Sequence, residues 1–189
     1  MDEQLIKKHK AKKMMLWLGM ISMSMTFAGL TSAYVVSSSR RDWLSQFEIP
    51  SAFSISTVLI FLSSVCFYMA KKSLIAKNIK QTKNCVMATF ILALFFVYFQ
   101  FKGFGDIIEE GYYFTGAESS ITTSFLYVLV LLHLVHLFAG MIVLFVVYLR
   151  LLSGSYLVSN TTGFELAHLF WHFLDILWIY LYLFVKLYS

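Results

Sequence analysis

Five long stretches of apolar residues set the strongest limit on how this chain can fold. Each holds about the 20 apolar residues that a helix needs to cross the roughly 30 Å hydrocarbon core of a bilayer. They cover residues 14–37, 51–70, 85–104, 121–149 and 164–185. Because unpaired backbone groups are costly in lipid, each stretch should be helical. We therefore predict an all-α membrane protein in which residues 1–189 form a single transmembrane domain, a bundle of five helices.

The composition favours the same fold class. Of the 189 residues, 59% are hydrophobic and 13% are charged, whereas a soluble domain is nearer half apolar and a quarter charged. Cys66 and Cys85 are too few for a disulfide scaffold, and we expect both to be reduced thiols. The basic residues gather in short loops rather than on a nucleic-acid-binding face, so we expect no nucleic acid as a partner.

The distribution of Lys and Arg predicts the orientation of the bundle. Eleven of the 15 basic residues lie before the first stretch, between the second and third, or just after the fourth. The segment 105–120, on the opposite side, has acidic residues and no basic ones. Cytoplasmic loops are the basic ones, so we expect a cytoplasmic N-terminus and, with five spans, an outer C-terminus. The first stretch is too long for the core of a cleaved signal peptide, and none is expected.

Ionisable residues inside the apolar stretches are concentrated in the last two. They are His133 and His136 in the fourth stretch and Glu165, His168, His172 and Asp175 in the fifth. The spacings of three and four residues place each set on one face of its helix. Ionisable groups are costly in a membrane, which makes these six the candidates for function. We predict that the two faces meet and exchange hydrogen bonds as one structural polar seam.

Three interpretations of this polar seam stay open from the residues alone. The simplest is structural, because polar contacts between membrane helices contribute on the order of 1 kcal/mol each. A metal or haem site is the second: Glu165 and His168 have the Glu-x-x-His spacing of di-iron bundles, although the chain has no second copy. The third is a proton or ion relay, which His and Asp within a membrane suit, although the first three stretches offer almost no further stations.

The sequence around these residues resembles subunit III of the haem–copper respiratory oxidases. Residues 164–178 are similar to a family pattern of Glu followed by Trp-His-Phe-x-Asp-x-x-Trp, and residues 132–136, followed by Gly140, resemble its Leu-His-Gly-x-His motif. Gln100, Phe27-Ala28-Gly29 and the aromatic segment 111–114 also have counterparts there. The positions of the family motif beyond the polar seam are Gln100, Gly140, Trp171, Phe173 and Trp178.

The sequence also departs from many members of that family. Met23 stands where they have a membrane-embedded glutamate, so no role of that carboxylate, such as proton collection or lipid coupling, is transferred. Leu134 replaces a glycine of the histidine motif, and Gly103 replaces a glutamate. Seven-helix members have two further N-terminal helices, so the resemblance is to the five-helix bacterial type.

The resemblance implies a non-redox subunit III of a proton-pumping terminal oxidase, a translocase of the aerobic respiratory chain in the bacterial cell (inner) membrane. Subunit I would reduce oxygen to water with its own haem and copper, and this chain would have no catalytic centre and no metal. Its roles would be complex stability, phospholipid binding and proton uptake. The implied partners are subunit I, other oxidase subunits, membrane lipids and a respiratory supercomplex.

Two other classes of function remain alternatives. One is a free-standing membrane protein that translocates protons or ions, and the other is a membrane haem protein. The sequence does not distinguish cytochrome c from quinol as the electron donor of an oxidase complex.

Overall fold

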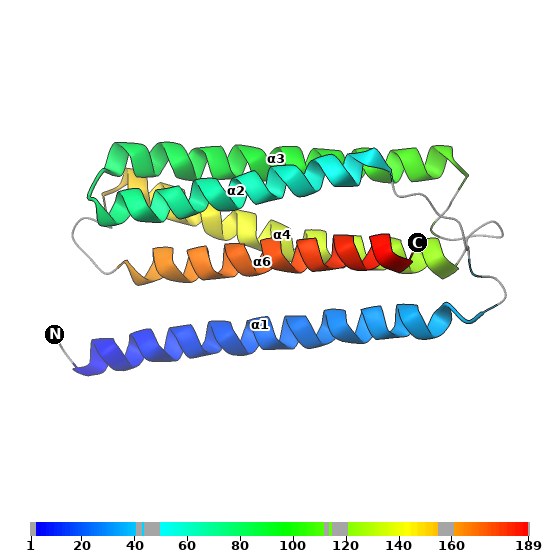
Figure 1. The fold of residues 1–189 in the computed structure, drawn as a ribbon. Helices are drawn as coiled ribbons and strands as arrows, with labels where there is room; N and C mark the ends of the chain where they lie inside the picture. Colours follow the sequence, from blue (N-terminus) through cyan, green and yellow to red (C-terminus); the bar gives the residue numbers. More distant parts are fainter. Residues whose placement is uncertain are drawn as a thin grey trace.

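The computed structural model describes residues 3–40, 43, 50–111, 114, 121–154 and 161–188, and within them the chain forms five long helices (Figure 1). These are α1 (Glu3–Ser37), α2 (Ser51–Ile75), α3 (Ile79–Glu109), α4 (Ile121–Leu152) and α6 (Thr162–Tyr188). All five are long and apolar enough to cross a membrane. The all-α fold class with five candidate spans is therefore confirmed, and the chain is a multi-pass membrane protein.

Each helix runs past the apolar stretch that predicted it. α1 already includes the lysines that precede residue 14, and α3 continues to Glu109, into the segment expected to be a loop. The extension follows from the helix itself, because its backbone hydrogen bonds are internal and persist where side chains become polar. Tyr112, Tyr113 and Glu118, which belong to the expected loop, lie outside the described residues.

A tight turn joins α2 to α3 and makes them an antiparallel hairpin. Lys77 has a left-handed backbone (φ 57°), and its N–H bonds to the Leu74 carbonyl at 3.0 Å. The N–H of Asn78 bonds to the Ser73 carbonyl at 3.0 Å, which completes a Schellman ending. The Asn78 side chain then accepts from the N–H of Gln81 and caps the start of α3.

The hairpin α2–α3 has the most extensive helix contact, and α6 packs against α2, α4 and α1. Among the described helices, α1 contacts only α6 and α4, and it lies along one edge of the bundle, away from α2 and α3 (Figure 1). Thr31 and Tyr180 place their hydroxyl oxygens 3.0 Å apart, and His9 is hydrogen-bonded to Thr162 at the other end. These two polar contacts thus attach α1 to α6 near each of its ends.

Aromatic side chains fill the interior between the helices. Trp171, Trp178, Phe27, Phe67 and Phe96 are all fully buried. Trp178 lies where α2, α3 and α4 converge on α6, with Phe96 edge-on at 5.1 Å and His133 tilted at 5.2 Å between ring centroids. The core is thus centred on α6, the helix with four of the six residues of the predicted polar seam.

Candidate functional site

A continuous chain of hydrogen bonds links α6 to α2 inside the bundle. The Ser64 hydroxyl on α2 is hydrogen-bonded to Asp175, and its oxygen lies 2.7 Å from Nδ1 of His172. Nε2 of His172 in turn lies 3.0 Å from Nε2 of His168. Asp175 is buried, whereas His172 and His168 are half-buried. The chain of bonds therefore runs from a buried carboxyl group towards the surface.

Helical periodicity explains why these four side chains meet. His168, His172 and Asp175 are spaced by four and three residues, so they share one face of α6. On α2, Ser64 and Lys71 are separated by two turns, so both side chains lie on one face, the face packed on α6. We call the row His168, His172 and Asp175 the α6 stripe. The α2–α6 contact places Ser64 beside Asp175, at the inner end of this stripe, and Lys71 near His168, at its outer end.

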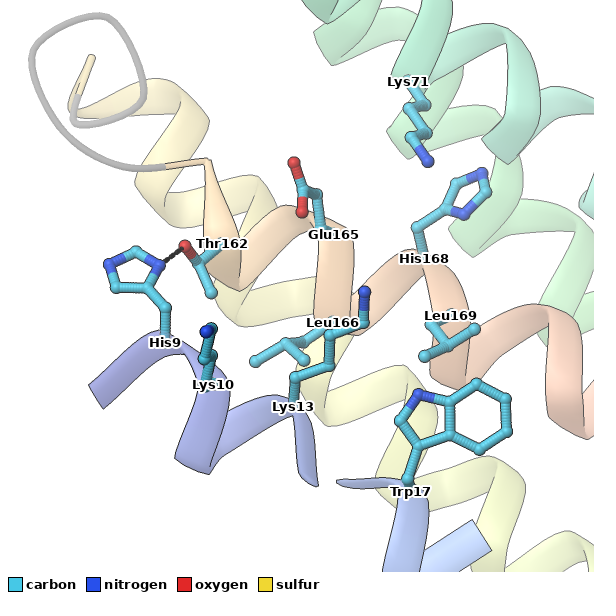
Figure 2. A pocket seen from close by; sticks show the side chains of 10 residues that line it. All are labelled: His9, Lys10, Lys13, Trp17, Lys71, Thr162, Glu165, Leu166, His168 and Leu169. Atoms are coloured by element: carbon cyan, nitrogen blue, oxygen red, sulfur yellow. Dashed lines mark hydrogen bonds between the residues drawn. The ribbon is translucent and has the colours of Figure 1, made fainter. Parts of the chain in front are cut away.

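The outer end of the stripe opens into a pocket of about 340 Å³ between α1, α2 and α6 (Figure 2). Three lysines surround it: Lys10 and Lys13 on α1 and Lys71 on α2. Figure 2 shows Lys71 above His168, with Glu165 and Trp17 also lining the pocket. We call this feature the basic pocket. Its charge and depth suit an anionic group, because ammonium groups attract phosphate and carboxylate.

The two histidines of α4 do not join this chain of bonds. His133 is fully buried, and neither ring nitrogen has a hydrogen-bond partner among the described residues. Nδ1 of His136 lies 2.8 Å from the carbonyl oxygen of Leu132, on its own helix. His133 instead contacts the ring of Trp178, and Phe27 contacts both histidines. The expected hydrogen bonds between the α4 and α6 stripes are therefore absent among the described residues.

The physical reason for the difference is that hydroxyl groups of α2, which can both donate and accept hydrogen bonds, reach the α6 side chains. Sequence reasoning considered ionisable groups only, whereas α2 presents a series of hydroxyl groups to α6. Small polar residues in a membrane helix typically mark the face that packs on another helix. The serines and threonines of the second apolar stretch could therefore have indicated this contact. The residues that were missed are Ser56, Thr57, Ser63 and Ser64.

The family-motif side chains on α3 and α6 bond to the same hydroxyl series. Nε1 of Trp171 donates to Ser63 at 3.1 Å, and Nε1 of Trp178 donates to Thr57 at 3.0 Å. Nε2 of Gln100, on α3, donates to Ser56 at 2.8 Å. Phe173 is half-buried against the core. Gly140 on α4 lies where a Cβ atom would come within 2.8 Å of Leu174.

Replacing Gln100 with leucine should change the free energy of unfolding by no more than about 1 kcal/mol, although the residue is fully buried. Leucine removes the Gln100 carbonyl oxygen, which has no partner among the described residues. Ser56 would still donate to the Phe53 carbonyl, at 2.8 Å. Unfolding of the full chain in detergent micelles measures the change, and a much larger loss would contradict this account.

No metal-binding cluster is found in the described part of the chain: no three His, Cys, Asp or Glu side chains there are grouped so as to hold a metal ion. Glu165 is exposed and pairs weakly with Thr161 rather than with a second Glu-x-x-His motif. The arrangement is instead a polar contact between two helices that ends in a basic pocket.

The sequence matches the family described as cytochrome c oxidase subunit III over residues 6–189. The chain belongs to the cytochrome c oxidase subunit III family. It is 31% identical, over 91% of its length, to cytochrome bo(3) ubiquinol oxidase subunit 3 of Buchnera aphidicola subsp. Acyrthosiphon pisum, and it covers 84% of that protein. The family resemblance of residues 100–178 is thus confirmed by a match that extends over nearly the whole chain.

Relatives named cytochrome c oxidase subunit 3 match over a smaller part of their length. Cytochrome c oxidase subunit 3 of Drosophila yakuba is 32% identical over 72% of this chain, and that of Papio hamadryas is 29% identical over 74%. The chain spans about half the length of these relatives, 49% and 50% respectively.

Proposed function

We propose that this chain is the subunit III of a haem–copper respiratory oxidase complex and that its role there is not redox chemistry. The match to the subunit III family over residues 6–189 is the observation on which this rests. Subunit I of the same complex would be its main contact and would hold the haem and copper that reduce oxygen. The donor would be cytochrome c or quinol, since relatives of both kinds match the chain.

The contacts of the motif residues support a role in stability. Trp171, Trp178 and Gln100 all donate hydrogen bonds to hydroxyl groups of α2, and a buried donor that loses its partner costs free energy. These residues therefore fix α2 against α3 and α6. In this proposal the family motif specifies one packing of the bundle, which in turn presents a fixed surface to subunit I.

Purification of the tagged chain from its native membranes tests the proposal. In mild detergent, the chain should co-purify with a larger subunit that contains haem and shows a Soret absorption band. The chain expressed alone should show no Soret band after incubation with haem. Purification as a free-standing protein from membranes that contain an assembled oxidase, or haem bound by the isolated chain, would contradict it.

We further propose that the end of the bundle where α1 begins faces the cytoplasm of a bacterial cell. Most of the lysines lie there, at the start of α1 and α3 and at the end of α2, as the rule of positively charged inner loops requires. Cysteine labelling by a membrane-impermeant reagent tests it. A cysteine at Lys8 should react only in inverted vesicles, and one at Tyr188 only in intact spheroplasts.

The basic pocket would hold the headgroup of an anionic phospholipid. Lys13 and Lys71 supply positive charge from two helices, and Trp17 lies beside them where an interfacial aromatic side chain is expected. Replacing both lysines with alanine should weaken binding of phosphatidylglycerol by roughly 1 kcal/mol per lysine. Native mass spectrometry of the chain with added lipid measures the loss.

A double variant of Lys80 and Lys83 is the matched control for the pocket. Both lie at the start of α3, near the same end of the bundle, and neither lines the basic pocket. Lys80→Ala with Lys83→Ala removes the same charge and should leave phosphatidylglycerol binding within twofold of the unaltered chain, a difference of about 0.4 kcal/mol. An equal loss in both double variants would show that net charge, and not the pocket, attracts the lipid.

A further inference from the structure

The hydrogen-bonded residues Asp175, Ser64, His172 and His168 join a buried carboxyl group to the basic pocket without a gap. We propose that they form a proton path, along which a proton moves from the pocket to Asp175 and is stored there. This deepens the role in proton uptake that the resemblance to subunit III implies, and its purpose rests on the proposed function. The chemistry of the path concerns this chain alone, so the two proposals can fail separately.

The path begins in a form in which every link donates towards Asp175. The Asp175 carboxylate accepts from the Ser64 hydroxyl, whose oxygen accepts from Nδ1–H of His172. Nε2 of His172, without a proton, accepts from Nε2–H of His168. Each neutral imidazole has one N–H and one acceptor nitrogen, so this arrangement is allowed for both histidines. Nδ1 of His168 is then the free acceptor at the outer end of the path.

A proton that binds to Nδ1 of His168 moves each hydrogen along by one link. His168 passes its Nε2 hydrogen to His172, which passes its Nδ1 hydrogen to the Ser64 oxygen. Ser64 passes its own hydrogen to Asp175. All four groups are then neutral: Asp175 is a carboxylic acid that donates to Ser64, Ser64 donates to His172, and His172 donates to His168. One proton has entered, and the reverse sequence releases it to the pocket.

The path ends at Asp175, which makes it a store rather than a channel. Oδ1 of Asp175 is buried and has no hydrogen-bond partner among the described residues. The indole N–H groups of Trp171 and Trp178 donate to Ser63 and Thr57 rather than to this carboxyl group. A buried carboxylate with one unpaired oxygen is costly in a membrane, so uptake of a proton relieves that cost.

Charged and titratable side chains from three helices line the pocket at the outer end of the path. The charged ones are Lys71 from α2, Glu165 from α6, and Lys10 and Lys13 from α1, and His9 of α1 lines the same pocket. The lysines disfavour a lasting positive charge on His168 through electrostatic repulsion. The exposed Glu165 carboxylate, on the same pocket, provides a group that can collect protons from water. These surroundings favour transfer through His168 over retention on it.

Infrared spectroscopy of the full chain in lipid nanodiscs tests the path directly. The carbonyl stretch of a protonated Asp175 is identified as the band that disappears in Asp175→Asn. In deuterated water this band should shift rapidly as the acid proton exchanges. Replacing the central link, in Ser64→Ala, should slow that shift at least about tenfold, and His172→Phe should slow it as well.

Two matched variants separate the path from general effects of substitution. Ser63→Ala removes the adjacent hydroxyl of α2, which bonds Trp171 and lies off the path. His136→Phe makes the same change as His172→Phe at another half-buried position, and the hydrogen bond of His136 is to a carbonyl of its own helix. Both should exchange at the rate of the unaltered chain, and thermal unfolding confirms that every variant is folded.

Two results would overturn the proposal. One is the absence of a protonated Asp175 band at every pH at which the chain stays folded. The other is equal exchange rates in Ser64→Ala and Ser63→Ala. Neither result bears on whether the chain co-purifies with a haem-containing subunit, which tests the proposed function. Conversely, a chain that does not join an oxidase could still show the slowed exchange in Ser64→Ala.

Discussion

Replacing Trp178 with alanine should lower the free energy of unfolding by about 3 kcal/mol. The side chain is only 2% exposed. It contacts α2, α3 and α4 at once, through Phe53, Phe96 and His133. Alanine would leave a cavity where these rings converge. We expect a value near the low end of the usual range for such cavities, because the unfolded reference in lipid is also apolar, so that packing and one hydrogen bond are lost but little transfer free energy.

Two further variants check that packing is the cause of the loss at Trp178. Trp178→Phe gives up the hydrogen bond to Thr57 but fills most of the space, so it should be clearly milder than alanine. Ile176 lies two residues away on α6, and its side chain is 67% exposed. Ile176→Ala should therefore leave the free energy of unfolding nearly unchanged. Chemical unfolding in mixed micelles measures all three, and equal losses at positions 176 and 178 would refute the argument.

Leucine in place of Gly140 should separate α4 from α6 and destabilise the bundle by about 1 to 3 kcal/mol. A Cβ atom at this position would lie 2.8 Å from Cδ1 of Leu174 and 3.4 Å from the ring of Trp171. Leu174 can move its flexible end away from a single methyl group, so Gly140→Ala should be mild. The Trp171 ring is fixed by its bond to Ser63, so it cannot yield to a longer side chain.

Gly29→Leu is the matched control for the glycine series. A Cβ atom at Gly29, on α1, would meet nothing within 4 Å, so leucine there should leave the unfolding free energy nearly unchanged. The expected order of melting temperatures, from highest to lowest, is therefore Gly29→Leu, then Gly140→Ala, then Gly140→Leu. Melting followed by tryptophan fluorescence measures it, and a Gly140→Leu chain as stable as Gly29→Leu would show that close approach is not required.

The five spans could be predicted from sequence because lipid leaves the backbone few choices. Their ends could not, because the polar turns of α1 and α3 are stabilised by their own hydrogen bonds and have no apolar signature. The stripe of His168, His172 and Asp175 also followed from spacing alone. Hydrophobic periodicity gives the face of a helix but does not say which neighbour covers that face.

The partner of the stripe was the main feature that sequence reasoning did not reach. α4 was expected because its histidines are ionisable, whereas Ser64 on α2 makes the contact. A hydroxyl group is inexpensive in a membrane helix and therefore gives a weak signal, even though it can satisfy both an imidazole and a carboxyl group. The basic pocket was missed for a related reason, since it joins residues of α1, α2 and α6 that are far apart in the chain.

The separate position of α1 has a consequence for how the protein is made. α1 contacts only α6 and α4 among the described helices, and both are synthesised after α2 and α3 have left the ribosome. The hairpin α2–α3 can pair as soon as it is inserted, whereas α1 must remain in the bilayer without a partner until residues 121–188 follow. α1 is thus inserted well before the helices on which it packs, and a chain interrupted before α4 would leave it exposed to membrane quality-control proteases.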